Sequence, residues 1–375
     1  MLTARFIRQF VIFAFTAVVS SAAVQAAEPR KPFDHATLAR QALEKHIVPG
    51  YKNLVNAAKG LSQEMDRYCA KPPSPKPPRS VDRAFDAFVT AWGRVEHINF
   101  GPITQENRLE RILFFPDRRG LGARQVARAL QKRDPGVTDA QVLASKSVAL
   151  QGIGALEIVL FGERGKADDN AEARTHRCGF ARAVAANLLR LSQEVLDGWT
   201  REDGFRHTWL NPGAGNPLFV KPSEVTQVLA KSVDQGLERI RDERVAGPLA
   251  FGKQRRRLPA VLEKSNHTFR LTTANLEGLR DLYTTGGIQK AIVATESVDG
   301  IASVPDNAAL VLNEINTALK IARRLIGVPR PFDNSDITRR LIAMGFPLKN
   351  ARTQLTILMA ATAGLTLGFN SSDGD

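Results

Sequence analysis

The amino-acid sequence predicts an all-α fold made of two helical-bundle units. Apolar residues recur close to every 3.6 positions along most of the chain, and the N-terminal half has no clear segment with the two-residue period of a strand. A stretch rich in Gly, Pro and Asn over 201–222 separates two helical regions and is expected to link them. We therefore predict an N-terminal bundle over 28–200 and a C-terminal bundle over 223–375.

The first 27 residues have the pattern of a secretory signal peptide. Arg5 and Arg8 precede an apolar run, and Val24-Gln25-Ala26 fits a small-residue cleavage site. The run is too short for a membrane span, and no later segment approaches about 20 unbroken apolar residues. We expect cleavage of 1–27, export to a bacterial periplasm and no transmembrane segment in the mature chain.

The mature chain is strongly basic, because the formal net charge of +14 falls only to +12 when Arg5 and Arg8 are removed. Lys and Arg are scattered, and the densest cluster, at 253–257, has no aromatic-rich strand pattern beside it. We interpret this charge as a solvated surface, and we expect no nucleic-acid partner.

Two cysteines, Cys69 and Cys178, are the whole cysteine content of the chain. In an oxidising compartment an even count favours a disulfide over a metal pair or two free thiols. The bridge would join the end of an early helix to a later helix.

The first helical segment covers 34–69, and Pro49-Gly50 predicts a kink or a break within it. Five prolines make 71–79 an extended loop. Further helices of the N-terminal bundle are expected at 80–99, 107–115, 117–132, 138–149, 151–162 and 172–199.

The C-terminal bundle contains a basic connector with Gly and Pro over 246–259. The spacing of apolar and Asn residues in 267–283 is similar to that in 51–61, which suggests an internal duplication. Helices are expected at 223–245, 267–283, 308–326, 335–344 and 347–367.

Glu157 is the most informative single residue. It is the only charged residue in 151–162 and has apolar neighbours on every side, so we expect it to face the interior. A buried carboxylate requires an ion pair, hydrogen bonds, a proton or a metal. Arg108 and Arg111, one turn apart, are candidate counter-ions, and a functional site at Glu157 is the alternative.

Glu96 and His97 lie near the end of the helix expected at 80–99. A folded bundle could bring His97 close to Glu157 as a ligand, although a helix-end histidine that is hydrogen-bonded to the structure is the commoner case. No zinc-binding His-Glu-x-x-His, phosphate loop or dinucleotide fingerprint is present. The residues expected to line a polar ligand pocket between helices are Glu96, His97, Arg108, Arg111, Asp117 and Glu157.

A succession of motifs resembles the imelysin-like family of bacterial exported proteins, over nearly the whole mature chain. The motifs are Ala91-Trp92 through Phe100-Gly101-Pro102, Asn107-Arg108 through Phe115-Pro116-Asp117, Gly152 through Glu157 with Leu160-Phe161, Arg177-Cys178 through Trp199, and Gly368-Phe369-Asn370 with Asp373-Gly374-Asp375. The resemblance implies an all-α fold of two bundles and a role in iron-regulated uptake.

The family was once classed with metallopeptidases because of a Gly-x-His-x-x-Glu motif. Here Gly152 and Glu157 match that motif, but Gly154 replaces the histidine, so a metal held by this motif alone is not expected. The resemblance therefore implies a non-catalytic periplasmic protein that binds iron or another small ligand, with an envelope transporter as a candidate partner. A metal-dependent peptidase or hydrolase is the alternative.

Overall fold

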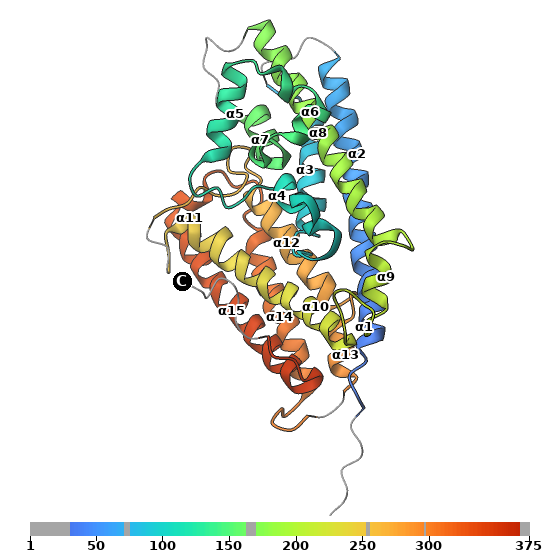
Figure 1. The fold of residues 1–375 in the computed structure, drawn as a ribbon. Helices are drawn as coiled ribbons and strands as arrows, with labels where there is room; N and C mark the ends of the chain where they lie inside the picture. Colours follow the sequence, from blue (N-terminus) through green and yellow to red (C-terminus); the bar gives the residue numbers. More distant parts are fainter. Residues whose placement is uncertain (1–30, 71–75, 163–169, 253–255, 296–297, 368–375) are drawn as a thin grey trace, which may run out of the picture. The chain divides into compact units, whose positions relative to one another are not determined.

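Helices make up nearly all the regular structure of the computed structural model (Figure 1). The structure describes residues 31–70, 76–162, 170–252, 256–295 and 298–367, and these ranges contain no strand. The all-α prediction is confirmed, while the internal duplication stays a prediction. The expected signal peptide and the motif at 368–375 lie outside the described residues.

The first half of the described chain combines long helices with single turns of other helix types. Its α-helices are α1 (His35–Ala42), α2 (Val48–Cys69), α3 (Arg79–Gly93), α4 (Arg108–Ile112), α5 (Leu121–Gln131), α6 (Ala140–Ser145), α7 (Gly152–Phe161) and α8 (Ala171–Thr200). A π-helix, η1, covers Leu43–Ile47, and 3₁₀ turns cover Gly101–Asn107, Pro135–Val137 and Val148–Leu150.

The second half of the described chain also combines α-helices with short π- and 3₁₀-helical segments. Its α-helices are α9 (Phe205–Leu210), α10 (Pro222–Arg239), α11 (Gly247–Leu249), α12 (Thr268–Tyr283), α13 (Ile288–Val293), α14 (Val304–Arg323) and α15 (Ser335–Ala363). A second π-helix, η6 (Ile240–Ala246), follows α10 directly, and a 3₁₀ turn covers Pro331–Asp333.

The interruption expected at Pro49-Gly50 occurs one turn earlier, as the π-helix η1 between α1 and α2. Pro49 lies in the first turn of α2, where the backbone N–H that proline lacks has no partner within the helix anyway. The apolar stripe of α2 is fully buried, as its periodicity predicts, at Tyr51, Leu54, Ala58, Leu61 and Met65.

Two expected boundaries are wrong. The helix expected to reach residue 99 ends at Gly93, so Glu96 and His97 lie in the turn that follows α3. The break expected before Pro347 does not occur, because burial of residues such as Leu348 along α15 outweighs the local cost of a proline inside the helix.

The expected linker over 201–222 contains the short helix α9. The indole of Trp209 on α9 is fully buried, and its N–H donates to the carbonyl oxygen of Ala39 at 3.0 Å. The described residues from Lys31 onward form one compact unit by their internal contacts, and the division into two bundles stays a prediction.

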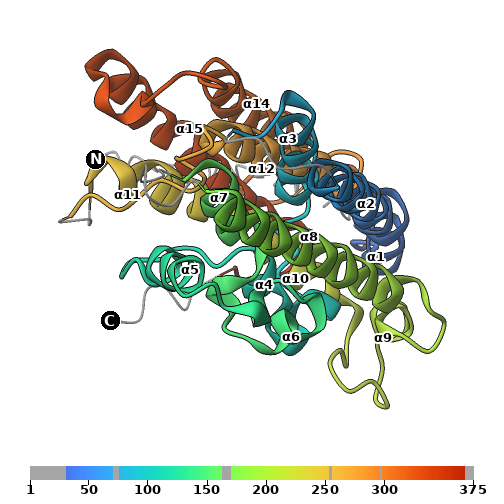
Figure 2. The same cartoon turned by 90° about the horizontal axis from the view of Figure 1, so that it is seen from above.

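A chain of helix contacts runs through this unit. α2 lies alongside α8, and α3 packs against both α2 and α12 (Figures 1 and 2). α12 packs on α14, α14 on α15, and α15 on α10. The contact between α3 and α12 therefore connects the N-terminal helices with the C-terminal ones.

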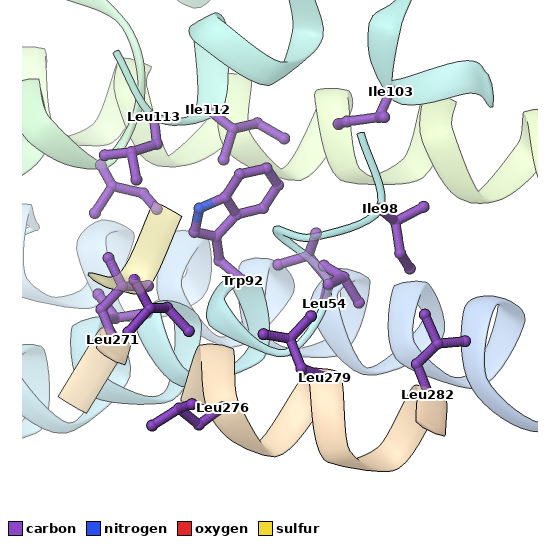
Figure 3. Packing of buried hydrophobic residues seen from close by; sticks show 14 of the residues in the cluster. Leu54, Trp92, Ile98, Ile103, Ile112, Leu113, Leu271, Leu276, Leu279 and Leu282 are labelled. Carbon is purple, nitrogen blue, oxygen red and sulfur yellow. The ribbon is translucent and has the colours of Figure 1, made fainter. Parts of the chain in front are cut away.

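Two glycines allow the close approach of α3 and α12. A Cβ atom at Gly93 would lie 2.6 Å from the Cβ atom of Ala274, and one at Gly278 would overlap the carbonyl oxygen of Arg94. Leucines of α12 and Trp92 of α3 then share one core with Leu54 of α2 (Figure 3).

Cys69, the last residue of α2, forms a disulfide with Cys178 of α8, and their Cα atoms lie 5.6 Å apart. The predicted bridge is confirmed. Among the described helices, none has the length and apolar character required to cross a membrane.

The glycine contact predicts opposite effects for the same substitution at two helix-interior positions. Gly278→Ala is expected to destabilise the protein by about 1–3 kcal/mol, because the added methyl group pushes α12 away from α3. Gly60→Ala on α2 meets no atom within 4 Å and is expected to stabilise by about 1 kcal/mol. Urea unfolding measures both, and equal effects would contradict the packing argument.

Candidate functional site

Glu157 is buried on α7, with 6% of its surface exposed. Its Oε1 accepts two hydrogen bonds from Ser265, one from the backbone N–H at 2.8 Å and one from the hydroxyl at 2.9 Å. Burial raises the pKa of Glu157, and the two Ser265 donors oppose that rise. The segment that leads into α12 therefore holds the carboxylate in place.

A pocket of about 280 Å³ lies beside this carboxylate. We call it the Glu157 pocket; α7, the loop before α5 and the segment 258–264 line it. Gly154 lies on its wall, and a Cβ atom there would meet no atom within 4 Å. The position at which the related motif has histidine is therefore open space one turn from Glu157.

Asp117 lines the same pocket but has a structural role. Its Oδ1 accepts from the backbone N–H of Leu121 at 2.7 Å, and its Oδ2 accepts from that of Gly122 at 2.8 Å. These bonds satisfy two N–H groups at the start of α5 that have no partner within the helix. Both oxygens of Asp117 are thus engaged by backbone.

The donor set of the Glu157 pocket does not fit a resident metal ion. Gly154 supplies no ligand, and Asp117 is occupied at both oxygens. Nowhere in the described part of the chain do three His, Cys, Asp or Glu side chains gather in a group that could hold a metal. Protein metal sites of this kind usually require three or four such donors.

Glu96 is the centre of a separate buried cluster, which we call the Glu96 cluster and which comprises Glu96, His97, His46, Arg244 and Asn275. Glu96 Oε1 accepts from Arg244 Nη2 at 2.6 Å, and Oε2 accepts from Asn275 Nδ2 at 2.7 Å. The Arg244 side chain is 1% exposed, and its guanidinium lies 4.5 Å from the centroid of the Phe115 ring. The charge of Glu96 is therefore compensated inside the core.

His97 pairs with His46 of η1, with 3.0 Å between their Nε2 atoms. Burial lowers the pKa of both rings, that of His46 to about 4, so both are neutral at physiological pH. His97 Nδ1 is buried and has no hydrogen-bond partner in the part of the chain that the structure describes. The two π-helices each supply one partner here, His46 from η1 and Arg244 from η6, and π-helical turns are frequent at functional sites.

Neither candidate counter-ion reaches Glu157. Arg108 donates from Nε to Glu194 at 3.0 Å and from Nη1 to the carbonyl oxygen of Pro102 at 3.0 Å. Arg111 Nε is buried and has no hydrogen-bond partner among the described residues. Of the six predicted lining residues, Asp117 and Glu157 share a pocket, Glu96 and His97 share a cluster, and the two arginines belong to neither.

The sequence analysis missed the residues that complete these sites, namely Ser265, Arg244 and His46. Ser265 is 108 residues from Glu157, and Arg244 is 148 residues from Glu96. The one signal in the sequence that pointed to Ser265 was the polar run before α12. Backbone N–H groups near the start of a helix lack partners within it and require an acceptor.

The fold and the pocket together define a class: an all-helical protein, over the residues described, with a small and largely apolar pocket beside a buried carboxylate. The family model for imelysin, also named peptidase M75, matches residues 47–343. The chain belongs to the imelysin family.

Two crystal structures share its fold. An imelysin-like protein from Psychrobacter arcticum has a TM-score of 0.72 at 17% identity, covering 90% of this chain and 100% of that one. A putative iron-regulated protein A precursor from Parabacteroides distasonis has a TM-score of 0.64 at 11% identity, covering 88% and 97%. No curated protein matches the sequence.

The buried histidine pair predicts a loss of stability in acid. Since the folded pKa of His46 is about 4 and the unfolded value is near 6.5, its contribution is complete above pH 6.5. It is then lost as the pH falls toward 4, by about 3 kcal/mol. Replacing both rings at once, by His46→Leu with His97→Leu, is expected to remove this slope in urea unfolding. The exposed His207→Gln is the control, and a double variant that keeps the wild-type slope would contradict the assignment.

Glu157 predicts a pH dependence of stability opposite to that of the histidine pair. Its folded pKa is raised above 4.5, so the wild type loses stability as the pH rises from 4.5 through that value. Glu157→Gln keeps an acceptor for Ser265 without the charge and is expected to be at least as stable as the wild type at neutral pH. The difference should shrink toward pH 4.5 in denaturant titrations. The exposed Glu110→Gln should show no such trend.

Proposed function

We propose that this chain is a non-catalytic binding protein of the bacterial periplasm, and that the Glu157 pocket holds a small iron-containing ligand during iron uptake. The observation that carries the proposal is the open space at Gly154 beside a buried carboxylate. That space has room for a ligand, whereas a histidine there would fill it with a side chain of the protein itself.

In this proposal, most of the atoms that coordinate the iron belong to the small ligand and not to the protein. Iron bound directly by the chain would need several carboxylate or imidazole ligands. Of the carboxylates that line the pocket, Asp117 is engaged by the start of α5, Glu263 is 47% exposed and lies 3.9 Å from Arg257, and Glu157 is the buried one. A volume of about 280 Å³ suits a small chelate, in which Glu157 accepts from a polar group of the ligand or completes its coordination.

Export and iron are supported by separate observations. The Cys69–Cys178 disulfide is typical of an oxidising compartment, in agreement with the predicted signal peptide. The link to iron is supported by the Parabacteroides structure, which is that of a putative iron-regulated protein, and by the resemblance in sequence. An envelope transporter that receives the ligand is the partner that this function implies.

A metal-dependent peptidase is the second candidate, favoured by the name of the family. Gly154 weighs against it, because a helix needs donors one turn apart to share a metal, and glycine offers none. In this chain the motif keeps the glutamate and loses the imidazole.

Titration calorimetry with ferric citrate tests the proposal. The wild type and the exposed Glu110→Gln are expected to bind it equally. Gly154→Leu, whose side chain enters open space, and Glu157→Gln are each expected to bind at least about tenfold more weakly. All four proteins are also incubated with zinc and a peptide substrate.

Two results would overturn the assignment. Unchanged binding in Gly154→Leu and Glu157→Gln, with an altered melting temperature alone, would mean that the pocket is structural. Zinc-dependent cleavage by the wild type that is lost in Glu157→Gln would favour the peptidase.

A further inference from the structure

A second and larger pocket, of about 620 Å³, lies where η6 meets α15. We call it the Arg239 pocket. Its walls come from the end of α10, from η6, from the part of α15 between Leu341 and Lys349, and from the loop containing Pro116 and Arg118. α10 and α15 lie side by side along it (Figure 1). Its volume is in the range of pockets that hold small organic molecules.

Three of the charged residues that line this pocket form ion pairs, namely Glu238, Arg241 and Asp242. Arg241 donates to both oxygens of Asp242, at 2.6 and 2.8 Å. Glu238 accepts from Arg352 at 2.9 Å and lies 3.6 Å from Arg241. Arg352 also donates to both oxygens of Asp234, at 2.8 and 3.0 Å, so this network of two arginines and three carboxylates carries one net negative charge.

The remaining charges are unbalanced. Arg118, Arg239 and Lys349 line the pocket, and none of them forms an ion pair with a described residue. Glu243 is the one unpaired carboxylate on the wall. Burial raises its pKa, and the nearby guanidinium groups of Arg244, Arg239 and Arg118 oppose that rise. The charged residues that line the pocket are four cations and three carboxylates, which leaves an excess of one positive charge, on the side of Arg118, Arg239 and Lys349.

The rest of the wall is apolar. Val245, Leu258, Leu341 and Ile342 line the pocket between the charged groups. Phe346 is 68% exposed and Phe251 is 49% exposed, both at this pocket. Large exposed aromatic side chains beside a cavity are typical of a surface that a ligand covers.

We propose that the Arg239 pocket binds a small organic anion with an apolar, ring-sized body. The anionic group lies against Arg239 and Arg118, and the body packs on the leucines and Phe346. A bare inorganic anion would leave the apolar wall uncovered, and a neutral apolar molecule would leave the cations without a counter-charge. This site does not depend on the function proposed for the Glu157 pocket.

Two probes with one ring system and opposite charge test the proposal. Naphthalene-2-carboxylate and naphthalen-2-ylmethylammonium are titrated into the full-length mature protein by calorimetry. The carboxylate is expected to bind at least about tenfold more tightly. Equal affinity, or tighter binding of the ammonium, would overturn the proposal.

Charge variants locate the site by the sign of their effect. Arg239→Gln is expected to weaken carboxylate binding about fivefold, and Glu243→Gln to strengthen it by a similar factor. Lys320→Gln, an exposed cation on α14 outside the pocket, should change nothing. Effects of the same sign at Arg239 and Glu243 would contradict the assignment.

A steric series provides a second measurement. Gly345 lies on the pocket wall inside α15, and a Cβ atom there meets no atom within 4 Å. Gly345→Ala should therefore keep most of the binding, and Gly345→Phe should abolish it while the melting temperature is retained. Wild-type affinity in Gly345→Phe would place the probe elsewhere.

Discussion

The buried ion pair between Glu96 and Arg244 fixes the segments on which both pockets depend. Glu96 follows α3, Arg244 belongs to η6, and Asn275 of α12 bonds to the same carboxylate. Removal of one partner from such a pair leaves an uncompensated charge in the interior, at a cost of about 3–5 kcal/mol. The guanidinium also lies over Phe115, which lines the Glu157 pocket, and it is flanked in sequence by residues of the Arg239 pocket.

The fold was largely predictable, because helical periodicity is a local signal. The stripe of α2, the burial of Glu157 and the disulfide all follow from residue type and spacing. The break expected before Pro347 is wrong for a physical reason. Pro347 is buried within α15, and packing of that helix outweighed the local preference for a break.

The site was less predictable than the fold. Periodicity showed that Glu157 faces inward but not what it meets, since Ser265 is 108 residues away and reaches it only once α3 and α12 have packed. The candidates Arg108 and Arg111 were chosen for their spacing along one helix face, but Arg108 pairs with Glu194, and Arg111 Nε has no hydrogen-bond partner among the described residues. Gly154 was informative in the sequence and in the structure. The sequence shows that the histidine of the motif is absent, and the structure shows open space where its side chain would lie.

Pro116, Arg118 and Leu258 belong to the walls of both pockets. Occupants of two cavities with a common wall are thermodynamically linked whenever one of them displaces that wall. Linkage is reciprocal, so the factor by which a ligand in the larger cavity changes the affinity of the smaller one equals the factor in the reverse direction. If both proposed ligands bind, a displacement of Pro116, Arg118 or Leu258 by one of them would change the affinity of the other.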